Sequence, residues 1–161
     1  MSNKLVYKYQ NLKRGIMIPS EIQKIISIMK ANARHAYFAT SDEDQPQVRP
    51  VSPIVEDDMS IWVTTFNSSR KVKQIMHNPK CCLAFVEYPD GDKAVIVTGK
   101  AKIIADLTCK ERVWNLANFN LYQYFPKGIE DEEFCLLKIE IDKIEWRDSW
   151  EAGNKVYKPN K

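Results

Sequence analysis

Short apolar runs of strand length, separated by polar turns, repeat from Ala36 to Arg147 and constrain the fold most. AYFATS, PQVRPVSPIV and SIWVTT are separated by the acidic turns DEDQ and EDD. CCLAFVEY and AVIVTGKAKII flank a PDGD turn, and FCLLKIEIDKIEWR ends the series. Runs and turns of this kind are typical of antiparallel hairpins. The sequence therefore predicts six antiparallel strands, with Gly99 at a β-bulge inside the fifth.

Three helices are predicted around these strands. The first opens at Pro19-Ser20, where Ser20 and Gln23 fit a capping box, and it should lie over the sheet. A short helix in SSRKVKQIMHNP ends before Pro79, and a third begins at a capping box of Thr108 and Glu111. The apolar faces expected for these helices are Ile22, Ile25, Ile26 and Met29 in the first, Val72, Ile75 and Met76 in the second, and Val113, Trp114, Leu116 and Ala117 in the third. Closure of the six strands into a barrel would remove exposed edges, although the same periodicity also fits an open sheet.

The size and composition of the chain predict one compact domain over residues 1–161. The chain has 161 residues, 44% of them apolar, with a polar N-terminal lead (1–18) and a C-terminal tail (148–161) expected outside the strands. Its net charge of +3 is spread along the chain rather than gathered in a basic block, so no nucleic-acid partner is expected. No stretch approaches the ~20 apolar residues of a membrane span, and no membrane partner is expected.

The cysteines and histidines show no metal-binding or disulfide pattern. Cys81, Cys82, Cys109 and Cys135 lack C-x-x-C spacing, and the two histidines lie far apart in sequence. We therefore expect reduced thiols, no metal site and a cytoplasmic protein.

The segment Thr64-Thr65-Phe66-Asn67-Ser68-Ser69-Arg70-Lys71 predicts an anion site. A strand ending in hydroxyl and amide side chains passes directly into the first turn of a helix that carries two cations. Backbone N–H groups at a helix start are unpaired, hydroxyls add donors, and arginine can hold two phosphate oxygens at once. The same residues also fit a solvated helix start without any ligand.

Arg49 is the second candidate, because it interrupts an otherwise apolar strand. A guanidinium is costly to bury without an anionic partner. The alternative is that Arg49 extends to solvent or pairs with Glu56 or Asp57. The four tryptophans, taken alone, fit core or interface anchors better than partners of a bound ring.

Residues 38–86 resemble the split-barrel flavin proteins related to pyridoxamine-phosphate oxidase, and within them the bacterial general-stress-protein-like members. The shared pattern is a strand, an acidic turn, a strand with arginine, an aromatic strand ending in threonine, Ser-Arg-Lys, a short helix and Asn-Pro. The terminal Ile144-Glu145-Trp146 agrees more loosely.

The resemblance implies a mainly β fold with flanking helices, a six-stranded antiparallel split β-barrel, and a homodimer that binds FMN between its subunits. Arg49, Ser69, Arg70 and Lys71 would meet the flavin phosphate. The main chain of Pro50, Val51 and Ser52 and the strand end Thr64-Thr65 would lie along the ring and ribityl chain. Trp146 or a neighbouring aromatic residue of the other subunit would close the cleft.

Two departures argue against oxidation of vitamin B6. The true oxidases have a lysine five positions after the strand arginine, where this chain has Ile54, and their C-terminal basic motif has no match in residues 146–161. The hypothesis is therefore an FMN-dependent oxidoreductase for an unknown small molecule, with a reduced nicotinamide as electron donor and no assigned catalytic residue. The alternatives are a non-catalytic flavin-binding or stress-response protein, or a split barrel that binds haem or a deazaflavin.

Overall fold

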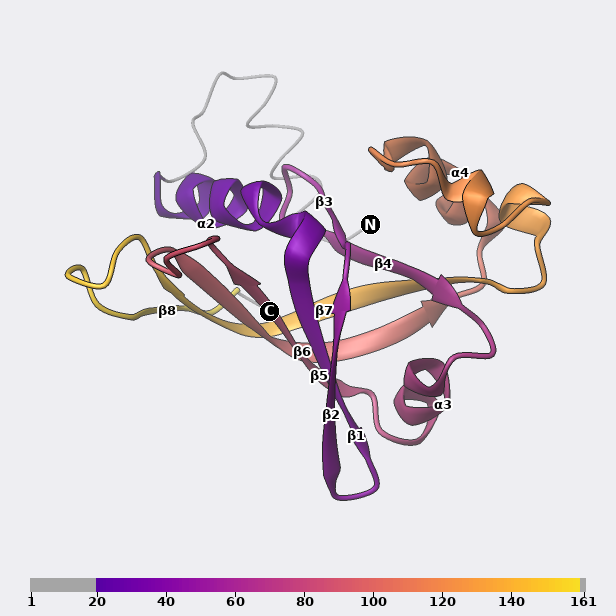
Figure 1. Ribbon diagram of the computed structural model, residues 1–161, viewed down its shortest axis with the longest axis horizontal. Helices are drawn as coiled ribbons and strands as arrows, with labels where there is room; N and C mark the ends of the chain where they lie inside the picture. The colour runs from indigo at the N-terminus through magenta and orange to yellow at the C-terminus, as the bar shows by residue number, and fades with distance from the viewer. Residues whose placement is uncertain (1–19, 160–161) are drawn as a thin grey trace.

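One antiparallel sheet forms the body of the protein, in a computed structural model that describes residues 20–159 (Figure 1). Its strands follow the order β2-β1-β5-β6-β7-β4-β3, and β8 pairs with β7. The strands are β1 (Ala36–Asp42), β2 (Gln45–Val51), β3 (Ile54–Val55), β4 (Ile61–Phe66), β5 (Lys80–Val86), β6 (Ala94–Ile104), β7 (Phe134–Arg147) and β8 (Lys155–Tyr157). The helices are α2 (Ser20–Ala31), α3 (Arg70–His77) and α4 (Leu107–Leu116), with 3-10 turns η1 (Ala33–His35), η2 (Leu121–Gln123) and η3 (Gly128–Glu130).

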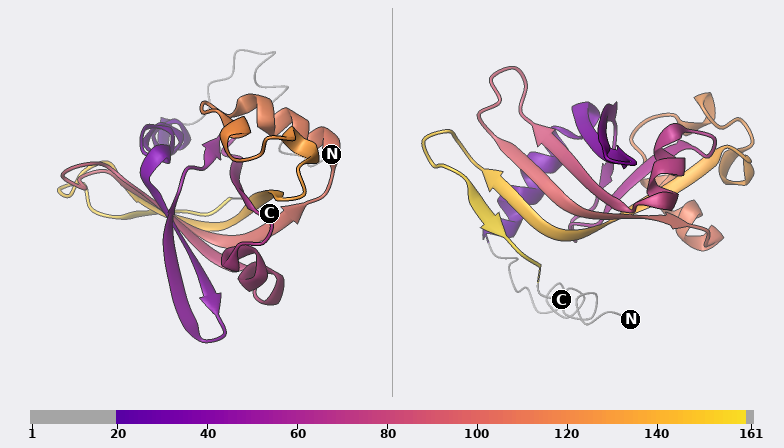
Figure 2. Two further views of the ribbon diagram at one scale, coloured as in Figure 1. Left: turned by 45° about the vertical axis from the view of Figure 1, so that its right-hand side comes forward. Right: turned by 90° about the horizontal axis from the view of Figure 1, so that it is seen from below.

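The sheet is curled rather than flat, as Figure 2 shows. β2 and β3 stand at opposite ends of the strand order, although only Ser52 and Pro53 separate them in sequence. Since consecutive Cα atoms are about 3.8 Å apart, two linking residues hold these two edges close together. This connection favours a split barrel over a flat open sheet. The mainly β split-barrel prediction is confirmed, with eight strands in residues 20–159 rather than the six predicted.

The strand prediction needs one refinement and one addition. The predicted second strand, residues 46–55, is divided into β2, which pairs with β1, and β3, which pairs with β4. Proline has no N–H to donate to a ladder, and Pro53 lies where the chain passes from one edge to the other. The segment expected as a C-terminal tail contains β8, and the N-terminal lead lies outside the described residues.

The main core fills the inside of the curled sheet and is covered by α2. Ile25, Ile26, Ile28 and Met29 of this helix are buried, so its apolar face is the predicted one with Ile28 added. α2 packs against β3 and β6, which confirms its predicted position over the sheet (Figure 1). No helix in residues 20–159 has the length and apolarity to cross a membrane.

A second apolar cluster lies beneath α4, η2 and η3, at the end of β4 and β7. The predicted cap of α4 was wrong, because Asp106 rather than Thr108 is the N-cap residue. The Asp106 carboxylate accepts a hydrogen bond from the backbone N–H of Cys109 at 2.6 Å. Aspartate is the better cap of the two, which places the helix start before Thr108.

Gly99 lies at a β-bulge, as predicted. The pairing of β6 with β7 shifts register between Thr98 and Gly99. A Cβ at Gly99 would lie 1.9 Å from the carbonyl oxygen of Glu140, so only glycine fits this close approach.

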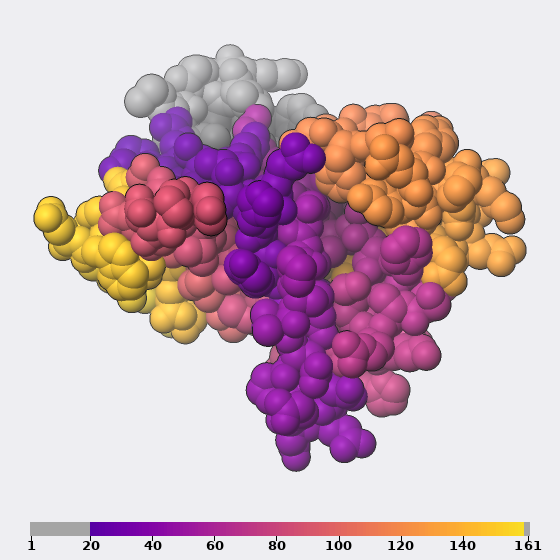
Figure 3. Space-filling view, in the orientation of Figure 1, coloured from indigo at the N-terminus to yellow at the C-terminus, as the bar shows by residue number. Residues whose placement is uncertain are grey.

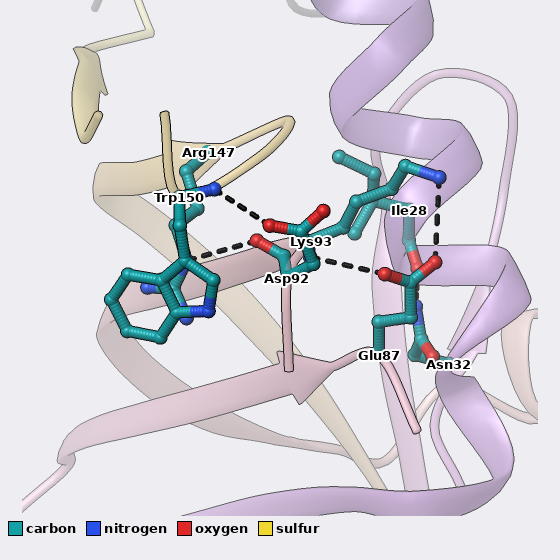
Figure 4. A network of polar contacts seen from close by, with 7 residues as sticks. All are labelled: Ile28, Asn32, Glu87, Asp92, Lys93, Arg147 and Trp150. Atoms are coloured by element: carbon teal, nitrogen blue, oxygen red, sulfur yellow. Dashed lines mark hydrogen bonds and ion pairs between the residues drawn. The ribbon is translucent and has the colours of Figure 1, made fainter. Parts of the chain in front are cut away.

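A polar network attaches the C-terminal segment to the turn between β5 and β6 (Figure 4). The Arg147 guanidinium donates to the carbonyl oxygens of Gly91 at 2.7 Å and Asp92 at 3.0 Å. The Trp150 N–H donates to the Asp92 carboxylate at 2.7 Å, and the Trp150 ring stacks on Arg147. These contacts fix the chain after β7 and allow β8 to return along β7.

Candidate anion-binding site

Two neighbouring parts of the fold bring the predicted cations together. β1 and β2 form a hairpin that projects from the body of the molecule (Figures 1 and 3), and their register places Arg49 opposite Phe38. The chain leaves β4 at Phe66, turns, and begins α3 at Arg70. α3 packs against β1, the strand that pairs with β2, and Arg49 of β2 reaches Gln74 of α3 through a hydrogen bond.

The Arg49 side chain is held by neutral acceptors. Its Nη1 donates to the carbonyl oxygens of Phe38 at 3.1 Å and Gln47 at 3.2 Å and to Thr40 Oγ1 at 2.6 Å. Its Nη2 donates to Gln74 Oε1 at 2.9 Å. The alternative pairing with Glu56 or Asp57 is not formed, because Glu56 binds Arg112 and Asp57 binds Lys30.

Lys71 lies beside the hydroxyls at the end of β4. Its Nζ donates to Thr65 Oγ1 at 2.8 Å, and Thr65 Oγ1 lies 3.4 Å from Ser69 Oγ. Ser69 is the N-cap residue of α3, but its side chain makes no capping hydrogen bond. The backbone N–H groups of Ser69 and Val72 donate to the carbonyl oxygens of Phe66 and Ser69. The N–H groups of Arg70 and Lys71, in the first turn of the helix, have no intrahelical acceptor. This end of α3 therefore presents hydroxyl and amide donors next to a cation.

Arg49, Arg70 and Lys71, which we call the cation cluster, repel one another. Partial burial lowers the pKa of Arg49 below its usual range, and the charge of Arg70 adds to the effect. Burial likewise lowers the pKa of Lys71, and the charge of Arg49 adds to it. Both shifts mean that the local environment disfavours the charged forms.

Within residues 20–159 no carboxylate forms an ion pair with the cation cluster. The neighbouring carboxylate of Glu133 instead accepts hydrogen bonds from the backbone and hydroxyl of Ser68, at 3.1 and 2.7 Å. In the described part of the chain, three cations, two hydroxyls and the start of a helix thus lie together without a paired carboxylate. This arrangement is suited to a phosphate group, whose oxygens would accept these bonds and offset the repulsion.

The remaining predicted positions beside Arg49 lie along the end of β2. Pro50 and Ser52 are exposed, and Val51 is half-buried against the main core. Ser52 Oγ donates to the Arg34 carbonyl oxygen at 3.4 Å. Thr64 is half-buried on β4, directly before the buried Thr65.

Trp146 is not brought to the cation cluster. It lies toward the other end of β7 from Cys135, the residue that pairs with Thr65. Its side chain is 2% exposed in the main core, and its indole N–H donates to Glu21 Oε1 at 3.2 Å. Within one chain Trp146 is therefore a core residue, whereas Trp150 is the exposed aromatic residue nearby in sequence.

Sequence reasoning missed Thr40 and Gln74. Gln74 is buried on the face of α3 that was assigned to Val72, Ile75 and Met76, while Met76 is 71% exposed. The face is displaced because the guanidinium of Arg49 needs an acceptor, which the Gln74 amide provides. In the sequence, only the alternation of side chains along β1 indicated that Thr40 would be buried, because it places Thr40 on the same face of the strand as Phe38.

Three of the cysteines are buried or half-buried thiols with raised pKa values. All four are free, as predicted. Burial raises the pKa of Cys81 to about 12, and it also raises the pKa of Cys82 and of Cys135. Since the thiolate is the reactive form, these three side chains remain unreactive thiols at neutral pH.

Comparison with known proteins gives matches over nearly the whole described chain. The family model described as "Pyridoxamine 5'-phosphate oxidase like" matches residues 20–158. General stress protein 26 of Bacillus subtilis (strain 168) is 27% identical over 124 residues, which are 76% of this chain and 84% of that protein.

Solved structures share the fold. General stress protein 26 from Bacillus anthracis superposes with a TM-score of 0.71 at 24% identity, over 86% of this chain and 98% of that one. A related protein from Clostridium acetobutylicum superposes with a TM-score of 0.72 at 19% identity, over 88% of this chain and 96% of that one. A haem-binding protein from Mycobacterium smegmatis superposes with a TM-score of 0.69 at 14% identity, over 88% of this chain and 59% of that one.

Proposed function

Since this chain belongs to the pyridoxamine 5'-phosphate oxidase like family, we propose that it binds FMN at the cation cluster and acts as an oxidoreductase on a small molecule. The observation that carries the proposal is the set of three cations with no carboxylate partner in residues 20–159. A phosphate ester is the part of FMN that such a set would recognise. We also propose a cytoplasmic location, because four free cysteines suit a reducing compartment.

The residues present fit the phosphate end of the cofactor. Arg49, Arg70 and Lys71 supply charge, and the hydroxyls of Thr65 and Ser69 supply neutral donors or acceptors. In our proposal the main chain of residues 50–52, at the end of β2 and just after it, and Thr64 lie along the flavin ring and its ribityl chain. The bound flavin would supply hydride or electron transfer, and the protein would set its position and access.

The outer face of the hairpin supports the proposal of a homodimer. Tyr37 is 50% exposed and Val48 is 69% exposed on this hairpin. Tyr37 lies on β1 and Val48 on the edge strand β2. Large exposed apolar side chains that share one face are typical of interfaces between chains. We propose that a second copy covers this face and that the exposed Trp150 of one copy is the aromatic residue nearest to the ring held by the other.

The structure supports a substrate other than pyridoxamine phosphate. Ile54, which stands where the true oxidases have a lysine, is buried in the second apolar cluster. This position therefore offers no charge to a phosphorylated substrate. We propose a small molecule that does not depend on a second phosphate site.

A non-catalytic flavin-binding protein is the second candidate. The cation cluster supports it equally, because holding the phosphate of FMN requires no catalytic group of the protein. A reduced nicotinamide added to the FMN-loaded protein, followed by an electron acceptor, separates the two candidates. Rapid bleaching and reoxidation with turnover supports the enzyme, whereas no bleaching with any acceptor supports the carrier.

The phosphate assignment is tested by FMN titration of Arg49→Ala and Lys71→Ala. Each change should weaken FMN binding by about 1–3 kcal/mol, the range for loss of a charge-assisted contact. Lys73→Ala is the matched control, since Lys73 is exposed on the same helix and forms no ion pair within the described chain. Unchanged FMN affinity in both cluster variants would refute the assignment.

A further inference from the structure

The hydrogen bonds of Arg49 use only part of its guanidinium. The group carries five N–H donors in one plane, one on Nε and two on each Nη. Nη1 is shared among three acceptors, Phe38 O, Thr40 Oγ1 and Gln47 O. Nη2 has one acceptor, Gln74 Oε1, and no hydrogen bond of Nε is formed within residues 20–159.

The two side-chain acceptors form a single unit at one edge of the guanidinium. Thr40 Oγ1 donates to Gln74 Oε1 at 2.6 Å while accepting from Nη1 at 2.6 Å. Since Gln74 Oε1 accepts from Nη2, both oxygens face the edge between Nη1 and Nη2. The remaining edge, formed by Nε and the second N–H of Nη2, has two parallel donors, which is the geometry that grips two oxygens of a phosphate.

Burial makes this unit a fixed support. Thr40 is 3% exposed and Gln74 is 5% exposed. Because arginine has no acceptor, the amide must present its oxygen, and this fixes the orientation of Gln74. The amide is also neutral, so it orients Arg49 without cancelling the charge that an anion needs.

We propose that Gln74 and Thr40 are positioning residues that hold the Nη1–Nη2 edge of Arg49 and thereby direct its Nε–Nη2 edge at the phosphate of FMN. This inference rests on the proposed function and assigns to the buried face of α3 a role in selecting phosphorylated flavin. The affected property is phosphate recognition, so riboflavin, which lacks the phosphate, should not respond.

The test compares FMN and riboflavin binding in Gln74→Leu by flavin fluorescence titration. We expect FMN affinity to fall about tenfold, since a hydrogen bond to a charged group is lost, while riboflavin affinity is unchanged. In an Arg49→Ala background the same change should alter FMN affinity less than about twofold, because Gln74 acts through Arg49. Gln74→Glu should weaken FMN binding more than Gln74→Leu, because a carboxylate would pair with Arg49.

Gln45→Leu is the matched control, since Gln45 is exposed at the start of β2 and should leave both affinities unchanged. Thr40→Val removes the other side-chain acceptor of Arg49. It replaces Gln74→Leu in the test if circular dichroism shows that Gln74→Leu is not folded. Equal losses for both flavins, an undiminished loss in the Arg49→Ala background, or no loss at all would overturn the inference alone. A wild-type chain that binds no FMN would overturn the proposed function instead, and this inference with it.

Discussion

At the scale of single residues, the charge state of Lys71 connects the site to pH. Burial and the charge of Arg49 lower the pKa of Lys71 in the free protein. A bound phosphate favours the protonated lysine, so it raises this pKa again. At a pH where Lys71 is protonated in both the free and the FMN-bound protein, its titration does not change FMN affinity. FMN affinity falls as the pH rises through the lowered pKa of Lys71 in the free protein.

We therefore predict that FMN affinity falls at alkaline pH, and that this fall begins at a lower pH than it would for a lysine with an unshifted pKa. Lys71→Arg should remove this decline, because arginine stays protonated. Equilibrium titrations between neutral pH and the onset of alkaline unfolding measure the effect. An identical alkaline decline in wild type and Lys71→Arg would contradict the assignment of Lys71.

The sequence indicated the charged residues of the site but not their supports. Arg49 and the Ser69-Arg70-Lys71 turn were recognisable because cations in an apolar strand or at a helix start need an explanation. Gln74 was not, because a polar residue inside a helical stripe looks like a break in the stripe. Its role depends on a contact between β2 and α3 that no local pattern contains.

At the scale of elements, the close pairing of β6 and β7 depends on Gly99. We predict that Gly99→Ala lowers the free energy of unfolding by about 2–4 kcal/mol, because the added Cβ would collide with the backbone of Glu140. Urea denaturation measures the loss. Thr98→Ala, at the exposed neighbouring position, should change stability by less than about 0.5 kcal/mol. Equal stability of Gly99→Ala and wild type would show that the bulge tolerates a side chain.

Element types were predictable, whereas boundaries that depend on partners were not. Alternation and turn residues identified the main strands, and an isolated glycine identified the bulge. The division of residues 46–55 into β2 and β3 could not be read locally, because it depends on which strand each half pairs with. The start of α4 was misplaced because Asp106 and Thr108 both lie where a cap is plausible, and only the bond to Cys109 decides between them.

At the scale of the whole molecule, curling of the sheet brings β2 and β3 together and leaves the outer face of the β1–β2 hairpin exposed. We predict that the protein is a dimer in sedimentation experiments and that Val48→Asp shifts it toward the monomer by placing charge on this face. Val156→Asp is the control, since Val156 is exposed on β8. A monomeric wild type that binds FMN fully would contradict the dimer proposal.

The central claim is that the cation cluster holds the phosphate of FMN, and the most direct measurement is the absorption spectrum of the native protein with mass analysis of any released ligand. We predict a flavin spectrum, or its appearance on adding FMN, with released FMN at about one per chain. A Soret band, or a folded protein that stays colourless and binds no FMN at saturating concentration, would contradict the claim.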